Sequence, residues 1–324
     1  MLSACQKPTI PEEVQTEIDQ QATTAVTLDL DSICNNLKKN MLEINAQRTT
    51  FALEQINRDL HLCLPLISPA QQKDLMNASN QMYKNFLYVD RSAEQQKAFN
   101  QYAFDQSPFP TIQQSHVEQL HPRDQYLLTH KGQAFIEVKD FGHGEARYYR
   151  NAQYLAKIFA PYFDDAEREF MMALADQNQT PAFDDESIFI SPQEIAQRAN
   201  FWSKYLNHYP KSPYKKDAQF LLNTYSYLLF LGLPNAPISN NFDHLDDIQA
   251  SSLNEIQLLA QQKNTLAYKA KLFLEFIKMN ESQRLKESND QTQLDPVNQL
   301  QHYLGLQSFS HLQKRDCFRD AICY

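Results

Sequence analysis

Residues 191–222 read SPQEIAQRANFWSKYLNHYPKSPYKKDAQFLL, and this stretch predicts two helices joined by a short turn. Ser191 can cap the first helix, with proline at its first position and Glu194 placed to complete a capping box. A Tyr-Pro pair ends that helix, and Ser212 followed by Pro213 starts the next one. The second helix is apolar on most faces, so we expect it to be buried.

Similar signals recur on both sides of this stretch. Apolar residues at helical spacing run through residues 29–64, and Ser68 before a proline predicts another helix start. Residues 282–292 are polar, and we expect them to be loose. Further helices are expected over residues 69–88, 93–104, 123–130, 151–177 with a break near Pro161, 252–262, 265–279, 296–304 and 310–321, with a short one inside 107–122.

One segment, residues 132–150, favours β structure. Its AFIEV and ARYY runs suit two strands, and the intervening FGHG suits a turn. We therefore predict an all-α protein: an irregular array of helical hairpins with one small β-hairpin. The expected parts are a tether over 1–27, a helical part over 28–131, the β-hairpin over 132–150 and a second helical part over 151–324, with 28–324 as one domain the alternative.

The composition argues against several function classes. Only 5 glycines occur in 324 residues, which disfavours a glycine-rich phosphate loop. The net charge of -9 argues against a nucleic-acid partner. The longest apolar run, residues 227–234, is far shorter than the about 20 residues that cross a bilayer. No cofactor or metal is expected from these patterns.

The sequence starts MLSACQ, and its Leu-Ser-Ala-Cys resembles the lipobox of bacterial lipoproteins. In that family the cysteine becomes the lipidated first residue of the mature protein, which implies lipid attachment at Cys5. The basic and apolar parts of a signal peptide do not precede the match, so we expect them upstream of Met1. Residues 6–26 are rich in Gln, Thr, Glu and Pro, which predicts a flexible tether.

The resemblance also implies a location. Gln6 stands where lipoproteins that stay at the inner membrane carry Asp. The resemblance therefore implies a lipid-anchored protein of the outer membrane that faces the periplasm and has other envelope proteins as partners.

Residues 199–222 resemble the joint between repeats in tetratricopeptide-like outer-membrane lipoproteins. In that family an aromatic-rich helix ends at Tyr-Pro and the next begins after Ser-x-Tyr, as at Tyr209-Pro210 and Ser212 to Tyr214. Larger residues stand at places where the family has alanine. A fainter copy lies 51 or 52 residues upstream, longer than the standard repeat of about 34 residues. The resemblance implies diverged helical hairpins rather than a regular solenoid.

Four cysteines remain besides Cys5: Cys34, Cys63, Cys317 and Cys323. An even count in an exported chain indicates two disulfides, with three possible connectivities. If the chain turns near residues 48–50, an antiparallel hairpin brings the first two sulfurs to the same level. We favour Cys34–Cys63 and Cys317–Cys323, with cross-pairing as the alternative.

Candidate catalytic groups are few. His143 and Glu145 flank a glycine in the expected turn, but the pair lacks a third orienting group. Cell-wall hydrolysis would need two carboxylates at a set separation, and the sequence cannot choose among several candidates. The acidic clusters lack the alternating spacing of a calcium loop. These candidates are Glu145, Glu167, Glu169 and Glu194, and the clusters are Asp164-Asp165, Asp184-Asp185-Glu186 and Asp246-Asp247.

Together these features predict a non-enzymatic envelope lipoprotein that acts as a protein–protein interaction scaffold in outer-membrane or cell-wall assembly. One rival is a cell-wall hydrolase, or an inhibitor of one, that uses the turn at Gly142–Gly144. Another is a structural spacer in a larger assembly.

Overall fold

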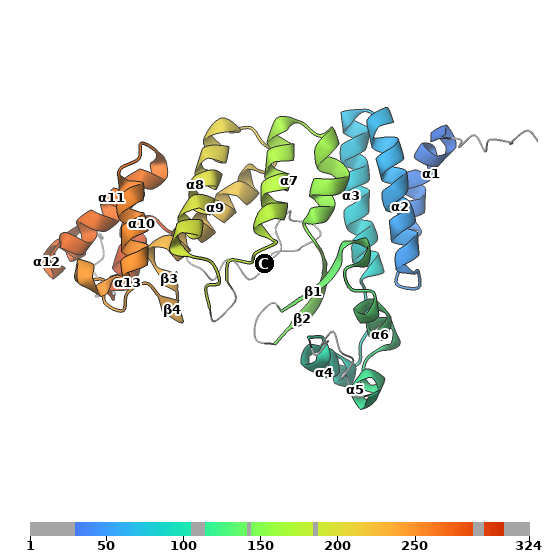
Figure 1. Cartoon of the computed structure of the whole chain (residues 1–324), viewed down its shortest axis with the longest axis horizontal. Coiled ribbons are helices and arrows are strands. Elements are labelled where there is room, and N and C mark those ends of the chain that lie inside the picture. The colour runs from blue at the N-terminus through green and yellow to red at the C-terminus, as the bar shows by residue number, and fades with distance from the viewer. Residues whose placement is uncertain (1–29, 105–113, 141–143, 184–186, 288–294, 308–324) are drawn as a thin grey trace, which may run out of the picture.

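The computed structural model describes residues 30–104, 114–140, 144–183, 187–287 and 295–307. Within them the chain is predominantly helical, with two antiparallel sheets of two strands each. The helices line up in an elongated array, with the N-terminal and C-terminal helices at opposite ends (Figure 1). The predicted all-α class with a small β-hairpin is confirmed.

Three helices form the N-terminal end of the array: α1 Leu30–Leu42, α2 Thr50–Cys63 and α3 Pro69–Phe86. The chain turns between α1 and α2, as predicted, and a disulfide joins Cys34 to Cys63 with their Cα atoms 5.4 Å apart. Ser68 and Gln71 form a reciprocal capping box at the start of α3. The Ser-Pro signal therefore marked this helix start correctly.

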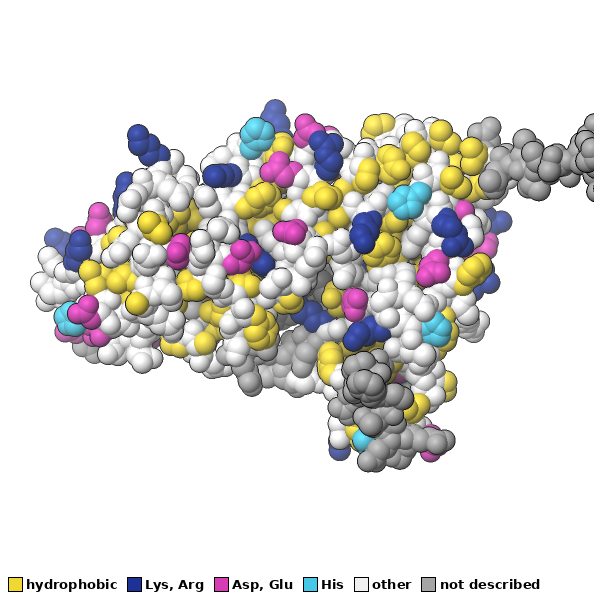
Figure 2. Space-filling model, in the orientation of Figure 1, with side chains coloured by type: hydrophobic (Ala, Val, Ile, Leu, Met, Phe, Trp, Pro, Cys, Tyr) yellow, Lys and Arg dark blue, Asp and Glu magenta, His cyan; other side chains and the backbone are white. Residues whose placement is uncertain are grey.

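A lobe of three short helices projects from the array (Figures 1 and 2): α4 Ala93–Tyr102, α5 Gln114–Gln119 and α6 Pro122–Thr129. The fully buried carboxylate of Asp124 accepts two hydrogen bonds from the Arg91 guanidinium, both 2.7 Å long. Tyr148 donates a third at 3.1 Å. This network offsets the desolvation of the buried charge and ties the lobe to the β-hairpin.

The β-hairpin consists of β1 Ile136–Asp140 and β2 Ala146–Arg150, with residues 136 and 150 paired at its base. β1 starts two residues later than predicted, because Ala134 and Phe135 have φ values of 47° and 62°. These two residues close a 3-10 turn, η3 Gln133–Phe135, which an extended strand cannot contain. Residues 141–143, at the tip, lie outside the described part of the chain.

Arg150 anchors the hairpin against α3. Its Nη2 donates to Oδ1 of Asn80 at 2.8 Å, and its guanidinium lies 4.4 Å from the ring centre of Tyr154 and 5.2 Å from that of Tyr83. Burial lowers the pKa of Arg150. The aromatic faces partly replace the lost water around this cation.

The predicted break near Pro161 is present. The chain forms a π-helical turn, η4 Leu155–Phe159, and a 3-10 turn, η5 Ala160–Tyr162, before α7 Asp165–Gln177 begins. Asp164 caps α7 by accepting the N–H of Glu167 at 3.0 Å.

The stretch at residues 191–222 forms the expected helix pair, α8 Pro192–His208 and α9 Lys215–Phe230. Ser191 caps α8 by accepting the N–H of Glu194, but the Glu194 carboxylate binds Arg198 at 2.8 Å. Only half of the predicted capping box therefore forms. Ser212 accepts the N–H of Tyr214 at 3.1 Å in the turn before α9, but the N-cap residue is Tyr214, so the predicted cap at Ser212 is wrong. Much of α9 is buried, as expected.

A second small sheet, not predicted, follows α9: β3 Gly232–Leu233 and β4 Ala236–Pro237. Gly232 has a φ of 82°, and a Cβ there would lie 2.5 Å from the carbonyl oxygen of Ala236. Glycine is therefore required for the chain to reverse this tightly. A 3-10 turn, η6 Leu245–Asp247, leads to the last helices.

Four helices complete the described chain: α10 Ala250–Ala260, α11 Thr265–Lys278, α12 Glu281–Glu287 and α13 Pro296–Tyr303. The expectation of a loose segment from residue 282 is wrong, because α12 covers its first part. Arg284 is only 4% exposed and donates to Asp243 and to the carbonyl of Ile277. One arginine thus orders an otherwise polar segment. Residues 288–294 and the helix expected over 310–321 lie outside the described residues.

Two hydrophobic cores meet on α7. Met171 belongs to the first core, which spans the N-terminal helices and the β-hairpin, whereas Phe170 belongs to the second, which spans α8 to α13. Tyr214 packs against both cores, and its ring stacks on Phe170 with centres 4.3 Å apart. The joint between α8 and α9 therefore also joins the two halves of the array.

Candidate binding cavities

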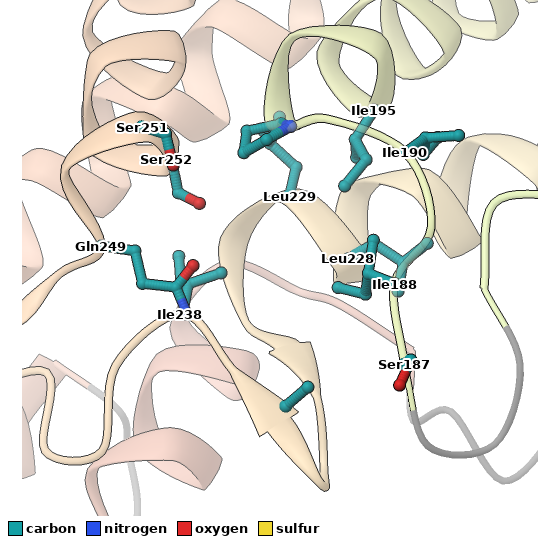
Figure 3. A pocket seen from close by; sticks show the side chains of 12 residues that line it. Ser187, Ile188, Ile190, Ile195, Leu228, Leu229, Ile238, Gln249, Ser251 and Ser252 are labelled. Carbon is teal, nitrogen blue, oxygen red and sulfur yellow. The ribbon is translucent and has the colours of Figure 1, made fainter.

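The first cavity, of about 360 Å³, lies between the start of α8, the end of α9, the β3–β4 turn and the start of α10 (Figure 3). Most of its lining residues are aliphatic, and the remaining lining side chains are polar but uncharged. The lining residues are Ser187, Ile188, Ile190, Pro192, Ile195, Leu228, Leu229, Ala236, Ile238, Gln249, Ser251 and Ser252.

The second cavity, of about 370 Å³, lies between α8, α9, α11 and the segment after α13. Amide side chains border a floor of leucines, and one lysine enters the lining. The lining residues are Ser203, Leu206, Asn207, Gln219, Leu222, Asn223, Ser226, Thr265, Leu266, Lys269, Gly305 and Gln307.

Lys269 fixes one wall of the second cavity. Its Nζ donates to the carbonyl oxygens of Leu304 and Gly305 at 2.5 and 3.3 Å, and burial lowers the pKa of this ammonium. A cation at the end of α13 is favourable because the last carbonyls of a helix lack partners within it. The contact holds the end of α13 against α11.

The predicted site residues are only partly described. Of the cysteines, Cys34 and Cys63 are paired, as favoured from the sequence, whereas Cys5, Cys317 and Cys323 lie outside the described residues. His143 also lies outside them. Its neighbour Glu145 is exposed and binds Arg147 at 2.7 Å.

The other candidate carboxylates are spread over α7 and α8, and none of them lines the first or the second cavity. Glu167 is buried beside Lys73 at 3.2 Å, and Glu169 accepts the hydroxyl of Tyr209 at 2.8 Å. Glu194 is held by Arg198. Each of these three groups thus already has a structural partner.

The acidic clusters serve as local caps where they are described. Asp164 caps α7, and Asp247 accepts the N–H of His244 at 3.0 Å. Residues 184–186 lie outside the described part. Across the described residues, no three His, Cys, Asp or Glu side chains are grouped to hold a metal ion.

Sequence reasoning missed both cavities, because their linings combine residues from segments far apart in the chain. The one available signal for the first cavity was the alternation of Ile188 and Ile190 around Phe189, which indicates an extended segment with one apolar side. The Ser251-Ser252 pair at a helix start gave no hint of a cavity. The wall could not be assembled without the fold.

Two further findings bear on function. None of the described helices combines the length and apolar character needed to span a bilayer. Comparisons with protein-family models, with curated proteins and with solved structures give no match to this chain.

Proposed function

We propose that the protein is a non-enzymatic, lipid-anchored scaffold of the bacterial envelope that binds another protein through its helical-hairpin array. In this proposal Cys5 carries the lipid, the anchor is in the outer membrane, and the array faces the periplasm. The lipobox resemblance supports the anchor. The Cys34–Cys63 disulfide supports an oxidising compartment, because such bonds are rare in the cytosol.

The second cavity is the observation that carries the binding role. Amide side chains both donate and accept hydrogen bonds, so Asn207, Asn223 and Gln307 can pair with the N–H and C=O groups of an extended peptide. Leu206 and Leu222 offer an apolar floor for one of its side chains. An amide-rich cavity, whose one lysine is held by the carbonyls of Leu304 and Gly305, suits recognition of a peptide backbone.

Photo-crosslinking in intact cells tests this role. The gene, with its natural upstream region, is expressed with a photoreactive amino acid at Asn223, and with the same residue at exposed Asn36 on α1 as the matched control. We expect a discrete adduct with one envelope protein from position 223 only. The purified partner should bind an Asn207→Ala/Asn223→Ala variant at least about tenfold more weakly, the equivalent of 1.4 kcal/mol, than an Asn36→Ala variant.

Two outcomes contradict the proposal. Equal adducts from both positions, or equal binding by both variants, would remove the second cavity as the binding site. Labelling with radioactive palmitate tests the anchor separately, since label that persists in a Cys5→Ala variant would exclude lipid attachment at Cys5.

A further inference from the structure

The first cavity has an aliphatic wall and a hydrogen-bonding end, and these two parts call for different atoms of one ligand. We propose that it binds a single aliphatic acyl chain, with the acyl oxygen held at the start of α10. This role is separate from peptide binding in the second cavity, and it does not depend on it.

The wall fits a hydrocarbon chain. Ile195, Leu228, Leu229 and Ile238 are buried, and they come from α8, from α9 and from the segment after β4. Ile188, from the segment before α8, lies beside Leu228 in this wall (Figure 3). The cavity volume of about 360 Å³ falls at the lower end of the range of about 300–1,000 Å³ for small-molecule sites. Each methylene of the chain that leaves water should strengthen binding by about fourfold.

The polar end offers hydrogen-bonding groups that face the cavity. Ser252 is 3% exposed, and it lines the cavity. Figure 3 shows its hydroxyl directed into the cavity. A serine hydroxyl both donates and accepts hydrogen bonds, so from this position it can bind an acceptor oxygen of a ligand in the cavity.

The start of α10 reinforces the same end. Its N-cap residue, Gln249, makes no side-chain hydrogen bond to the helix and instead donates to the carbonyl of Pro237 at 3.1 Å. The N–H groups of the first turn therefore receive no side-chain cap. Together with Ser252, they form a cluster of donors that selects an acceptor, and the positive end of the helix dipole favours an electron-rich oxygen.

The lining chemistry favours an acyl chain over other occupants. The described residues that line this cavity include no aromatic ring, on which a sugar would stack, and no charged side chain that would select a charged headgroup. They also lack the row of amides that the second cavity offers to a peptide backbone. A carbonyl or carboxyl oxygen on a hydrocarbon chain satisfies both ends of the cavity.

Calorimetric titration of the purified full chain with dodecanoic acid tests the proposal. We expect saturable binding of one molecule, and at least about tenfold weaker binding of dodecyltrimethylammonium, which has the same chain length but no acceptor oxygen. Ser252→Ala should weaken dodecanoate binding by about three- to tenfold, as expected for one lost hydrogen bond. Ser203→Ala is the matched control, because Ser203 is a buried helical serine that lines the second cavity.

A second measurement locates the chain directly. Dodecanoic acid with a diazirine near its methyl end should label peptides that contain residues 187–195 or 228–238, and Ala236→Phe, which fills the cavity, should abolish the labelling. Phospholipid vesicles with and without free dodecanoate distinguish a lipid-borne chain from a free fatty acid as the source.

Equal affinity for dodecanoate and dodecyltrimethylammonium, or labelling elsewhere in the chain, would overturn the proposal. The same holds if Ser252→Ala and Ser203→Ala bind dodecanoate equally. If Ala236→Phe does not fold, the Ser252→Ala and Ser203→Ala pair still decides the result.

Discussion

The indole Nε1 of Trp202 donates a hydrogen bond to Oε1 of Gln177 at 2.9 Å. This bond links the middle of α8 to the last residue of α7. The Trp202 ring is fully buried and lies 5.8 Å from the ring of Tyr205, with Tyr209 a further 5.1 Å along the same helix face. The hydrogen bond to Gln177 thus satisfies Nε1, the only polar atom of the buried Trp202 side chain.

We expect Trp202→Ala to lower the free energy of unfolding by about 3–5 kcal/mol, because it removes a large buried ring. Trp202→Phe should cost less, since it keeps most of the apolar volume and loses the bond to Gln177. Urea denaturation measures both changes. Phe189→Ala is the control, because Phe189 is 57% exposed and its loss should change stability by less than about 0.5 kcal/mol. A loss for Trp202→Ala as small as that of the control would contradict the core role.

The disulfide leads to a prediction about thiols. In denatured but non-reduced protein, Cys34 and Cys63 should resist alkylation, and we expect the same of Cys317 and Cys323. Mass spectrometry of alkylated peptides, before and after reduction, distinguishes all four. Cys63→Ala should lower the free energy of unfolding by about 2–4 kcal/mol, because the open loop gains conformational freedom when unfolded. Alkylation of all four cysteines before reduction would argue against export as well as against both bridges.

Glu167 should make stability depend on pH. Glu167 is 3% exposed, and burial raises its pKa above the ordinary value of 4.5, with Lys73 opposing the shift. The folded chain therefore binds this proton more tightly than the unfolded chain does. The resulting stability is present below the ordinary pKa and is lost as pH rises through the raised pKa.

We expect the melting temperature to fall less between about pH 4 and about pH 7 in Glu167→Gln than in the wild type, because the amide does not ionise. Thermal melts at the two pH values measure it for both proteins. If the variant shows the same difference as the wild type, Glu167 does not carry this dependence.

The hydrolase alternative rests on His143 and Glu145. If this turn has no catalytic role, His143→Ala and Glu145→Ala should leave the melting temperature and the cellular phenotype nearly unchanged, because Glu145 is exposed and its ion pair among the described residues is with its close neighbour Arg147. Incubation with peptidoglycan, followed by assay of soluble fragments, checks this directly. Fragment release that disappears in Glu145→Ala would favour the hydrolase over the scaffold.

Local signals predicted the helices best. Ser-Pro pairs fix helix starts through a cap and a preset φ, as at Ser68 and Ser191, and both act within a few residues. The Cys34–Cys63 pair also followed from local reasoning, because two arms of equal length meet at the same level. By contrast, α12 depends on Arg284 reaching Asp243, a partner 41 positions away that the pattern of α12 itself does not reveal.

The candidate cavities depend even more on the fold. Ser252 gains its significance only because Ile188 and Leu229, from distant segments, enclose the space in front of it. The β3–β4 turn was missed because two-residue strands carry too few residues to show alternation. Sequence patterns therefore predicted the elements, whereas the cavities arise from how those elements pack.

The shared position of α7 has a consequence for how the chain unfolds. Phe170 and Met171 are neighbours in sequence but belong to different cores, so loss of either core removes support from the same helix. The two halves of the array should therefore denature in one cooperative transition. The urea dependence of the free energy of unfolding should then reflect the surface that both halves expose when they unfold. If the chain is tethered at its N-terminus, a load on the C-terminal helices passes through α7 into the disulfide-linked end. The array would then transmit force as one body.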